Sequence, residues 1–184
     1  PDRALWSRCS NLKARGLLPF MGGVAHGTVQ LFATGPSCTL APQVAEGSHW
    51  SDARRNRANL AAGTNRSSVL HGTTMSLLIQ LYDINGSKRA GNTAHNVQLD
   101  IWHCDTNGLY SGVAASNTLG EDFLRGYQIT DSEGRVNFTT IYPGWHEGRA
   151  THICLRARAY DSLGNTTYNC VSRLFFDDDF TDEI

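Results

Sequence analysis

The distribution of apolar residues along the chain changes near residue 72. After that point, apolar residues alternate with polar ones or form short compact runs, which is typical of β-strands. The pattern predicts strands at Ser76–Tyr82, Val97–His103, Tyr127–Thr130, Val136–Ile141, Thr151–Tyr160 and Val171–Phe176. Turn sequences rich in Asp and Gly separate them, at Asp83–Gly86, Asp131–Gly134 and Asp161–Gly164. Short strands at this spacing predict an all-β fold, an antiparallel β-sandwich.

The part of the chain before this change follows a different pattern. Apolar residues at helical spacing, followed by Gly16, predict a short amphipathic helix over Asp2–Arg15. Residues 17–72 are rich in Gly, Ser, Asn and Arg, and we expect a long arm that covers an active-site wall or a subunit contact. The predicted organisation is one structural domain, with the N-terminal helix and arm over residues 1–72 and the sandwich core over residues 73–184.

Composition limits the classes of function. With 184 residues, 40% of them hydrophobic, the chain fits one globular domain with a sizeable core. The formal net charge is -1 and no run of Lys or Arg occurs, so we expect no nucleic-acid partner and no attraction to an anionic membrane. No apolar run approaches the roughly 20 residues that a membrane-spanning helix needs. Small-molecule chemistry and protein contacts remain open.

Candidate metal ligands occur in the stretch TIYPGWHEGRATHIC, Thr140–Cys154. Alternate side chains of a strand share a face, so His152 and Cys154 point the same way, while His146 returns from the preceding turn. Zinc, iron and copper accept imidazole and thiolate, and Tyr110 upstream can add a phenolate oxygen. These four residues are the predicted metal ligands. The alternative is a hydrogen-bonded core histidine and a cysteine that acts as a small hydrophobic residue or as half of a disulfide.

The five cysteines make an odd count. If Cys154 is kept for a metal, four remain, and they can pair in three ways. An oxidising compartment favours two disulfides, and the favoured pairs are Cys9 with Cys38 and Cys104 with Cys170. The alternative is a reduced protein in which several of these cysteines are buried.

Sequons for N-glycosylation stand at four positions, Asn65, Asn85, Asn137 and Asn165. They favour a secreted or secretory-pathway glycoprotein. Asn137 alternates with apolar residues in a predicted strand, so we expect it to stay unmodified.

Several ordered motifs resemble the intradiol ring-cleavage dioxygenases, and most of all their fungal extracellular branch. The motifs are Val97–Ser111, Phe123–Asp131, Tyr142–His152 and Leu174–Asp182. The resemblance runs from about Cys38 to the last residue. It implies a β-sandwich whose non-haem iron(III), held by two Tyr and two His, opens a catechol between its hydroxyl-bearing carbons with molecular oxygen. It also implies a homodimer formed through the N-terminal arm.

Two of the four ligand positions that the resemblance implies are substituted. The first Tyr ligand falls on Tyr110 and the first His ligand on His152. The second Tyr position carries His146, and the second His position carries Cys154. These two are the family's axial positions, and its axial Tyr leaves the iron when catechol binds and helps to accept a proton. That role has no phenolate in this chain.

The substitutions change the expected metal chemistry. Two phenolates keep iron oxidised, whereas an exposed thiolate beside ferric iron and oxygen is itself open to oxidation. One Tyr oxygen, two His nitrogens and a Cys sulfur suit tetrahedral zinc, or a three-ligand site with an open position. Such a metal can act as a Lewis acid or lower the pKa of bound water. The expected cofactor is one metal ion, zinc or iron, or none if the site has degenerated.

The pocket that the resemblance implies has further substitutions. The pocket loop reads Glu46–Trp50 in place of the family's Glu-Gly-Pro-Tyr-Tyr, and Arg173 replaces a neutral amide. Arg149 stands at the family's active-site arginine position, where it can hold an enolate or carboxylate. The predicted substrate-binding residues are His49, Trp50, Trp145 and Arg173. Taken singly, His49 also fits an exposed loop residue, Trp50 a packing residue and Arg173 a surface charge.

We predict an intradiol dioxygenase-like metalloenzyme with a remodelled site. Its substrate is an aromatic, phenolic or enolised small molecule, and its chemistry is non-oxidative, that of a lyase, isomerase, cyclase or hydrolase. In this hypothesis the metal polarises a substrate oxygen, Arg149 offsets negative charge, and Tyr110 or His146 handles a proton. The alternatives are a catechol intradiol ring-cleavage dioxygenase with an atypical iron site, and a non-catalytic small-molecule-binding protein.

Two other polar residues of the motifs are interpreted as structural. His103 alternates with apolar residues on the inward face of a predicted strand, which predicts a hydrogen-bonded core histidine. Arg125 lies just before a strand. We expect it either to pair with an acidic neighbour or to contact a ligand, with equal weight for the two.

Overall fold

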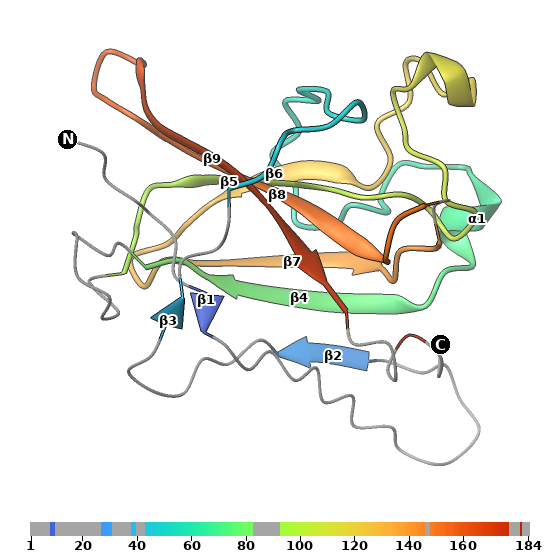
Figure 1. Ribbon diagram of the computed structural model, residues 1–184, viewed down its shortest axis with the longest axis horizontal. Helices are drawn as coiled ribbons and strands as arrows, with labels where there is room; N and C mark the ends of the chain where they lie inside the picture. Colours follow the sequence, from blue (N-terminus) through green and yellow to red (C-terminus); the bar gives the residue numbers. More distant parts are fainter. Residues whose placement is uncertain are drawn as a thin grey trace.

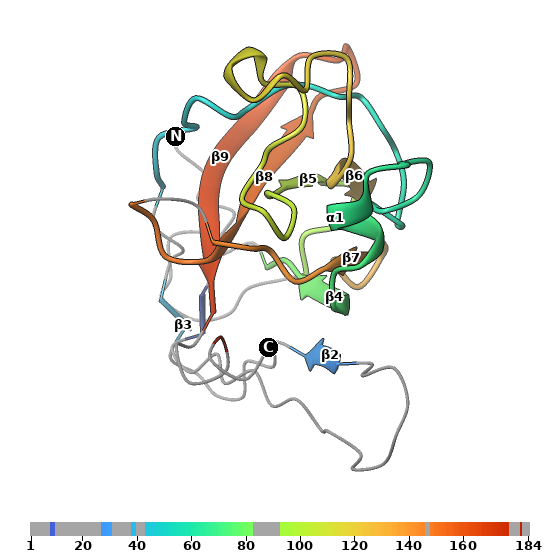
Figure 2. The same cartoon turned by 90° about the vertical axis from the view of Figure 1, so that its right-hand side faces the viewer.

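The structure is a computed structural model that describes residues 43–82, 93–145, 148–176 and 181, with the main chain alone of residues 8–9, 27–30 and 38–39. Two β-sheets pack face to face, as Figures 1 and 2 show from perpendicular directions. The first has the order β2-β4-β7, with bounds Gly27–Gln30, Thr74–Gln80 and Arg135–Ile141. The second has the order β6-β5-β8-β9, with bounds Arg125–Ile129, Gln98–Trp102, His152–Tyr160 and Thr166–Phe175. The predicted antiparallel β-sandwich is confirmed.

Smaller elements complete the described part of the chain. They are β1 (Arg8–Cys9), β3 (Cys38–Thr39), helix α1 (Ser67–Leu70) and one 3-10 turn (Ala114–Ser116). Strand β2 pairs with β4 in parallel, and the other pairs between labelled strands are antiparallel. No helix of the described residues has the length and apolar character that crossing a bilayer requires.

The predicted N-terminal helix is wrong at Arg8 and Cys9, because these residues form β1 and pair with β3. A helix of this length is marginal in water without a surface to pack on, so strand pairing overrides a weak helical pattern. The rest of the predicted helix lies outside the described residues. The β1–β3 register places Cys9 opposite Cys38. A disulfide between them stays a prediction.

Apolar faces of both sheets form the main core. In β7, Val136 and Phe138 point inward while Arg135 and Asn137 face outward, as period-two alternation requires. Leu77 of β4 lies in the same sheet, and the opposing layer of the core comes from β5 and β8, whose largest members are Leu99, Ile101 and Ile153. Each such side chain contributes roughly 1.5–3 kcal/mol when fully buried. This burial holds the two sheets in register.

Part of the N-terminal arm closes one side of the sandwich. Asn56 forms a bridge to Tyr127 in β6, and Asn59 forms a bridge to Thr139 in β7. The arm therefore covers the edges of both sheets, which would otherwise expose unpaired main-chain groups. Leu60, the next residue, is fully buried in the main core. The described part of the arm is thus built into the sandwich.

The turn predictions hold where they can be compared. In Asp131–Gly134 the amide of Gly134 donates to the carbonyl oxygen of Asp131, and the Asp131 carboxylate accepts the amides of Glu133 and Arg135. The Asp161–Gly164 turn has the same pattern and joins β8 to β9. The predicted turn at 83–86 lies outside the described residues.

His103 is a core residue, as its position in the pattern predicts. It is fully buried, and its Nδ1 lies 2.8 Å from the carbonyl oxygen of Cys104. A carbonyl only accepts, so Nδ1 carries the proton and Nε2 accepts from the hydroxyl of Thr140 at 2.7 Å. Burial lowers the pKa of His103 to about 4, so the folded protein holds it neutral.

Replacing Leu60 by Ala should lower the free energy of unfolding by about 2–5 kcal/mol, because it leaves a cavity in the main core. Denaturant titration measures this loss. Leu163→Ala is the matched control, since Leu163 is 84% exposed and its loss should cost less than about 0.5 kcal/mol. Equal stability of the two variants would show that the arm does not belong to the cooperative core.

His103 should make stability depend on pH below neutrality. An unfolded histidine takes up a proton near its ordinary pKa of 6.5, whereas folded His103 does so only near 4. The unfolded state therefore binds more protons in this window, and stability falls as pH drops from 6.5 to 4, by at most about 3 kcal/mol. Denaturant titrations across this range test it. His103→Gln, which cannot titrate, should show a shallower pH slope, and identical slopes would contradict this account.

Candidate functional site

Strand β8 presents two different faces. Its alternate apolar residues point into the main core: Ile153, Leu155 and Ala157. His152 and Cys154 therefore point to the outer side of the four-stranded sheet, where only 4% and 5% of their surface is exposed. Residues 43–55 and the β5–β6 loop cover this side, with Val44, Trp50 and Val113 packed against it. The two predicted ligands of β8 thus share one covered face.

Cys154 belongs to a row of four residues across this outer face. It lies opposite Arg173 of β9 on one side and opposite Trp102 of β5 on the other. Trp102 in turn lies opposite Arg125 of β6. Residues directly opposite in neighbouring strands point to the same face. A second apolar cluster forms along this row and includes Trp102, Cys104, Tyr110, Cys154 and Val171.

Tyr110 reaches the row from the loop between β5 and β6. The buried carboxylate of Asp105 accepts the main-chain amides of Asn107 and Leu109, which folds the start of this loop into a turn. The hydroxyl of Thr118 donates to the carbonyl oxygen of Tyr110 at 2.7 Å. Side-chain hydrogen bonds to the main chain therefore fix the backbone of Tyr110. Its side chain is only 1% exposed.

Tyr110 and His152 meet at the edge of the cluster. His152 Nδ1 donates to the carbonyl oxygen of Ala150 at 2.7 Å, which fixes the tautomer and directs Nε2 toward Tyr110. The distance from Tyr110 Oη to His152 Nε2 is 3.5 Å, long for a hydrogen bond. Burial, with smaller contributions from Cys154 and Cys104, raises the pKa of the Tyr110 hydroxyl, so it is protonated at neutral pH.

Positive charges surround the Cys154 thiol. Burial raises the pKa of Cys154, and the charge of Arg173 with its hydrogen bond, followed by the charges of Arg149 and Arg125, opposes that rise. The thiol is the stable form when no metal competes for the sulfur. Arg149 is exposed, whereas Arg173 is half-buried and also donates to the carbonyl oxygen of Ala45.

His49 and Trp50 come from the segment that covers the outer face. The imidazole of His49 stacks on the Tyr110 ring, with centroids 4.3 Å apart and an angle of 16° between the planes. Trp50 packs edge-on against Trp102 at 4.7 Å. The guanidinium of Arg156 lies 4.6 Å from the Trp50 ring centre, a cation–π contact. His49 thus borders the Tyr110 end of the site, and Trp50 holds the covering segment in place.

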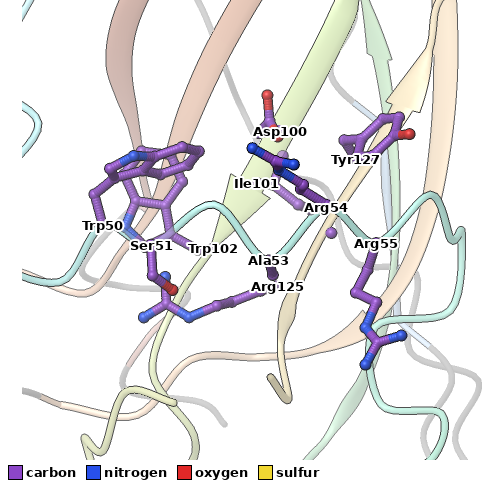
Figure 3. A pocket seen from close by; sticks show the side chains of 11 residues that line it. Trp50, Ser51, Ala53, Arg54, Arg55, Asp100, Ile101, Trp102, Arg125 and Tyr127 are labelled. Atoms are coloured by element: carbon purple, nitrogen blue, oxygen red, sulfur yellow. The ribbon is translucent and has the colours of Figure 1, made fainter. Parts of the chain in front are cut away.

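Arg125 is buried with only part of its hydrogen-bonding capacity used. It is 2% exposed, and its Nε donates to the hydroxyl of Ser111 at 2.8 Å. Its Nη2 donates to the carbonyl oxygen of Ser111, while Nη1 has no hydrogen-bond partner among the described residues. Figure 3 shows the guanidinium group beside Ser51 in a small pocket that Trp50 and Trp102 also line. The pocket volume of about 10 Å³ has room for about one water molecule.

The structure brings together some of the predicted site residues. Tyr110, His152 and Cys154 lie on one face, and the charges of Arg149 and Arg173 reach Cys154. Trp145 is 67% exposed. His146 lies outside the described residues, so its place as a ligand stays a prediction. Within the described ranges, no three side chains of His, Cys, Asp or Glu lie close enough together to hold a metal.

The predicted disulfide between Cys104 and Cys170 is wrong. Both are buried free thiols, as is Cys154. Cys104 belongs to the outer cluster and donates to the carbonyl oxygen of Gly144, whereas Cys170 faces the main core. They lie on opposite faces of one sheet, so their sulfurs cannot meet. Linear spacing does not reveal which face a cysteine occupies.

Sequence reasoning does not find the ion pairs of the outer face. Arg158 donates two hydrogen bonds to the buried Asp100, at 2.7 and 3.0 Å, and Arg156 pairs with Glu46 at 2.7 Å. The sequence did contain a signal for these ion pairs. Asp100 interrupts an apolar strand, and both arginines lie on the same face of β8 as Cys154. Arg125 has no acidic partner among the described residues and donates to Ser111 instead, while its expected contact with a ligand stays a prediction.

Comparisons with known proteins agree with this architecture. A family model described as Dioxygenase matches residues 50–164. An intradiol ring-cleavage dioxygenase from Tetranychus urticae is 27% identical with a TM-score of 0.65, over 79% of this chain and 68% of that chain. A catechol 1,2-dioxygenase from Pseudomonas arvilla, at 22% identity and a TM-score of 0.55, shares the fold over 73% of this chain and 45% of that chain.

A curated relative gives a shorter match. The chlorocatechol 1,2-dioxygenase of Pseudomonas putida is 34% identical over 62 residues, which is 33% of this chain. The matched region spans only 23% of that relative's length.

Alkylation of the denatured, unreduced protein should label Cys104, Cys154 and Cys170, because all three are free thiols. In native buffer the same reagent should react slowly with them, since burial raises the pKa of Cys104 to about 12 and also raises those of Cys154 and Cys170. Peptide mapping by mass spectrometry measures both. A peptide that links Cys104 to Cys170 would contradict the structure.

Proposed function

The chain belongs to the intradiol ring-cleavage dioxygenase family, and on this premise we propose that it is a metalloenzyme with a remodelled active site. Its substrate is an aromatic, phenolic or enolised small molecule, and its reaction is non-oxidative and metal-assisted, of the lyase, isomerase, cyclase or hydrolase type. The observation that carries the proposal is the meeting of Tyr110 and His152 beside a buried thiol at Cys154.

The described donors fit a metal ion. Adjacent ligands of a tetrahedral zinc lie about 3.3 Å apart for bonds near 2 Å, and the oxygen and nitrogen of Tyr110 and His152 are 3.5 Å apart. The carbonyl oxygen of Ala150 supports His152 from behind, as is usual for a histidine ligand. Cys154 would add sulfur, and His146 is the proposed fourth ligand. An oxygen, nitrogen and sulfur set favours zinc over ferric iron.

The residues around the donors have separate tasks in this proposal. The metal would supply a Lewis acid or a water of lowered pKa. Arg149 offsets negative charge that develops on the substrate. Tyr110 keeps its proton at neutral pH until a metal binds, so metal binding releases protons from Tyr110 and Cys154. Trp50 anchors the covering segment, which excludes water from the Cys154 side of the site.

One observation supports a second function. Tyr110 and His152 are half of the ligand set that the family uses for iron, and they converge here. Ring cleavage of a catechol with an atypical iron site is therefore the alternative. A non-catalytic binding protein is the third possibility, and absence of both metal and turnover would support it.

Secretion and dimer formation are also proposals. The sequons at Asn65 and Asn165 lie at exposed positions, which supports passage through the secretory pathway. A homodimer through the N-terminal arm rests on the family resemblance.

The purified protein should bind one equivalent of zinc without colour, and binding should release protons. His152→Ala should weaken zinc binding by more than about 100-fold, because it removes a ligand rather than a supporting group. Metal analysis and competition with a chelator measure stoichiometry and affinity. His71→Ala is the matched control and should bind zinc as the parent does, since His71 follows α1 and lies outside the proposed ligand set.

Iron provides the contrasting result. A coloured ferric protein that consumes oxygen with catechols would support the alternative and refute the zinc proposal. The double variant Cys154→His with His146→Tyr restores the family's ligand types and should gain ferric colour. If it stays colourless with iron, the substitutions at these two positions are not what excludes iron from the site.

A further inference from the structure

A cavity of about 520 Å³ lies where the N-terminal arm passes the β5–β6 loop. Arg55 and residues 63–66 of the arm line one side of it, and residues 120–123 of the loop line the other. Its volume falls within the roughly 300–1,000 Å³ that small-molecule sites occupy. Among the described residues that line it, none belongs to the proposed metal site, so this cavity has an occupant of its own to explain.

Ion pairs balance the charged side chains that line the cavity. Nη2 of Arg66 donates to both carboxylate oxygens of Glu121, at 2.7 and 2.8 Å, and Nε of Arg55 donates to Asp122 at 2.6 Å. An ionised ligand would have to displace one member of these pairs. A neutral ligand with hydroxyl groups can instead bond to the unused donors and lone pairs. The cavity therefore suits a neutral, polar occupant.

The arm wall of the cavity is held in place by its own contacts. The guanidinium of Arg66 lies 4.8 Å from the ring centre of Phe123, which is itself only 2% exposed. The amide of Arg66 donates to the hydroxyl of Thr64 at 3.2 Å. This turn fixes the main chain on both sides of Asn65, the residue between them.

Asn65 lines the cavity and begins the sequon Asn65–Ser67. It is exposed, and within the described part of the chain its side chain forms no hydrogen bond. The amide nitrogen, the atom to which an N-linked sugar is attached, is therefore not committed to a protein contact. A sugar on this nitrogen starts at the wall of the cavity.

Two other sequons have a different setting. In Asn165 the amide nitrogen donates to the carboxylate of Asp161 at 3.0 Å, within the turn that joins β8 to β9. In Asn137, which lies in the paired strand β7, the side-chain oxygen accepts from the hydroxyl of Ser76 at 3.3 Å. Asn85 lies outside the described residues. Of the three described sequons, only that of Asn65 combines an uncommitted side chain with a cavity.

We propose that Asn65 carries an N-linked glycan whose first N-acetylglucosamine lies in this cavity and joins the arm to the β5–β6 loop. The inference rests on the proposed secretory location and is independent of the metal. In the transfer, the Asn65 amide nitrogen forms a bond to C1 of the sugar and loses a proton, while the bond from C1 to a lipid diphosphate breaks. The secretory pathway of the host supplies the lipid-linked donor and the transferase.

A sugar in this cavity stabilises the folded state, because only the folded protein brings the two walls together. Within the described residues, Arg55 donates through Nε alone, so its other N–H groups can bond to sugar hydroxyls. The carboxylates of Glu121 and Asp122 can accept from the same hydroxyls. Because the sugar is attached to Asn65, it does not pay the loss of translational freedom that a free sugar pays on binding.

Peptide mapping of the full chain, secreted from a eukaryotic host, tests the attachment. Asn65 should carry a glycan, and Ser67→Ala, which destroys the sequon without changing Asn65, should remove that glycan alone. An unmodified Asn65 beside a glycosylated Asn165 would overturn the inference and leave the proposed secretion standing. A secreted protein without any glycan would also overturn it.

Thermal unfolding tests the contact with the cavity. Endoglycosidase treatment trims each glycan to one N-acetylglucosamine, and the trimmed parent should melt about 2–4 °C above Ser67→Ala treated in the same way. The same two proteins made in the bacterial cytoplasm, where no glycan is attached, should melt at one temperature. This comparison controls for the lost hydroxyl of Ser67. Equal melting of the two trimmed proteins would show that the sugar does not occupy the cavity.

Arg55→Gln assigns the effect to the cavity wall. The side chain of Arg55 is 62% exposed, so the change should cost the sugar-free protein little. It should reduce the melting shift that the sugar gives to below about 1 °C, because donors to the sugar are lost. Arg135→Gln is the matched control, since Arg135 pairs with Glu133 on the other sheet, and it should keep the full shift. A shift that survives Arg55→Gln would overturn the placement of the sugar.

Discussion

The two-faced character of β8 is the constraint on which the site depends. Ile153 and Leu155 are held in the core between the sheets, so the strand cannot rotate or slip by one residue without burying His152 and Cys154 there. The same alternation that stabilises the sandwich therefore aims the proposed ligands at the outer face. Pairing of β8 with both β5 and β9 then sets which residues stand beside them.

The outer face is an unusual second core. Sheets of a sandwich commonly leave this side to solvent, but here residues 43–55 and the β5–β6 loop bury it. Apolar packing around Trp102 lowers the local polarity, which raises the pKa of both Tyr110 and Cys154 and strengthens each charge interaction nearby. Acidic partners neutralise Arg156 and Arg158, whereas the charges of Arg125, Arg149 and Arg173 act on Cys154.

Family membership and site chemistry are separate questions in this chain. The sandwich follows the family, whereas in our proposal Tyr110 and His152 keep the roles that the resemblance implies and Cys154 places a thiol where it implies an imidazole. A fold of this kind tolerates such changes because ligands stand on rigid strands whose register the core maintains. A changed donor set can then alter metal preference and substrate class without loss of the scaffold.

Sequence alone determined the strands after residue 72, two of the tight turns and the burial of His103, because alternation and turn chemistry act within a few residues. It also pointed to His152 and Cys154 as neighbours, since period two is a local property. Only the tertiary structure decided that Cys104 and Cys170 lie on opposite faces, that Arg8 and Cys9 form a strand, and that Arg125 binds Ser111. These outcomes depend on contacts between segments far apart in the chain, and no local pattern records them.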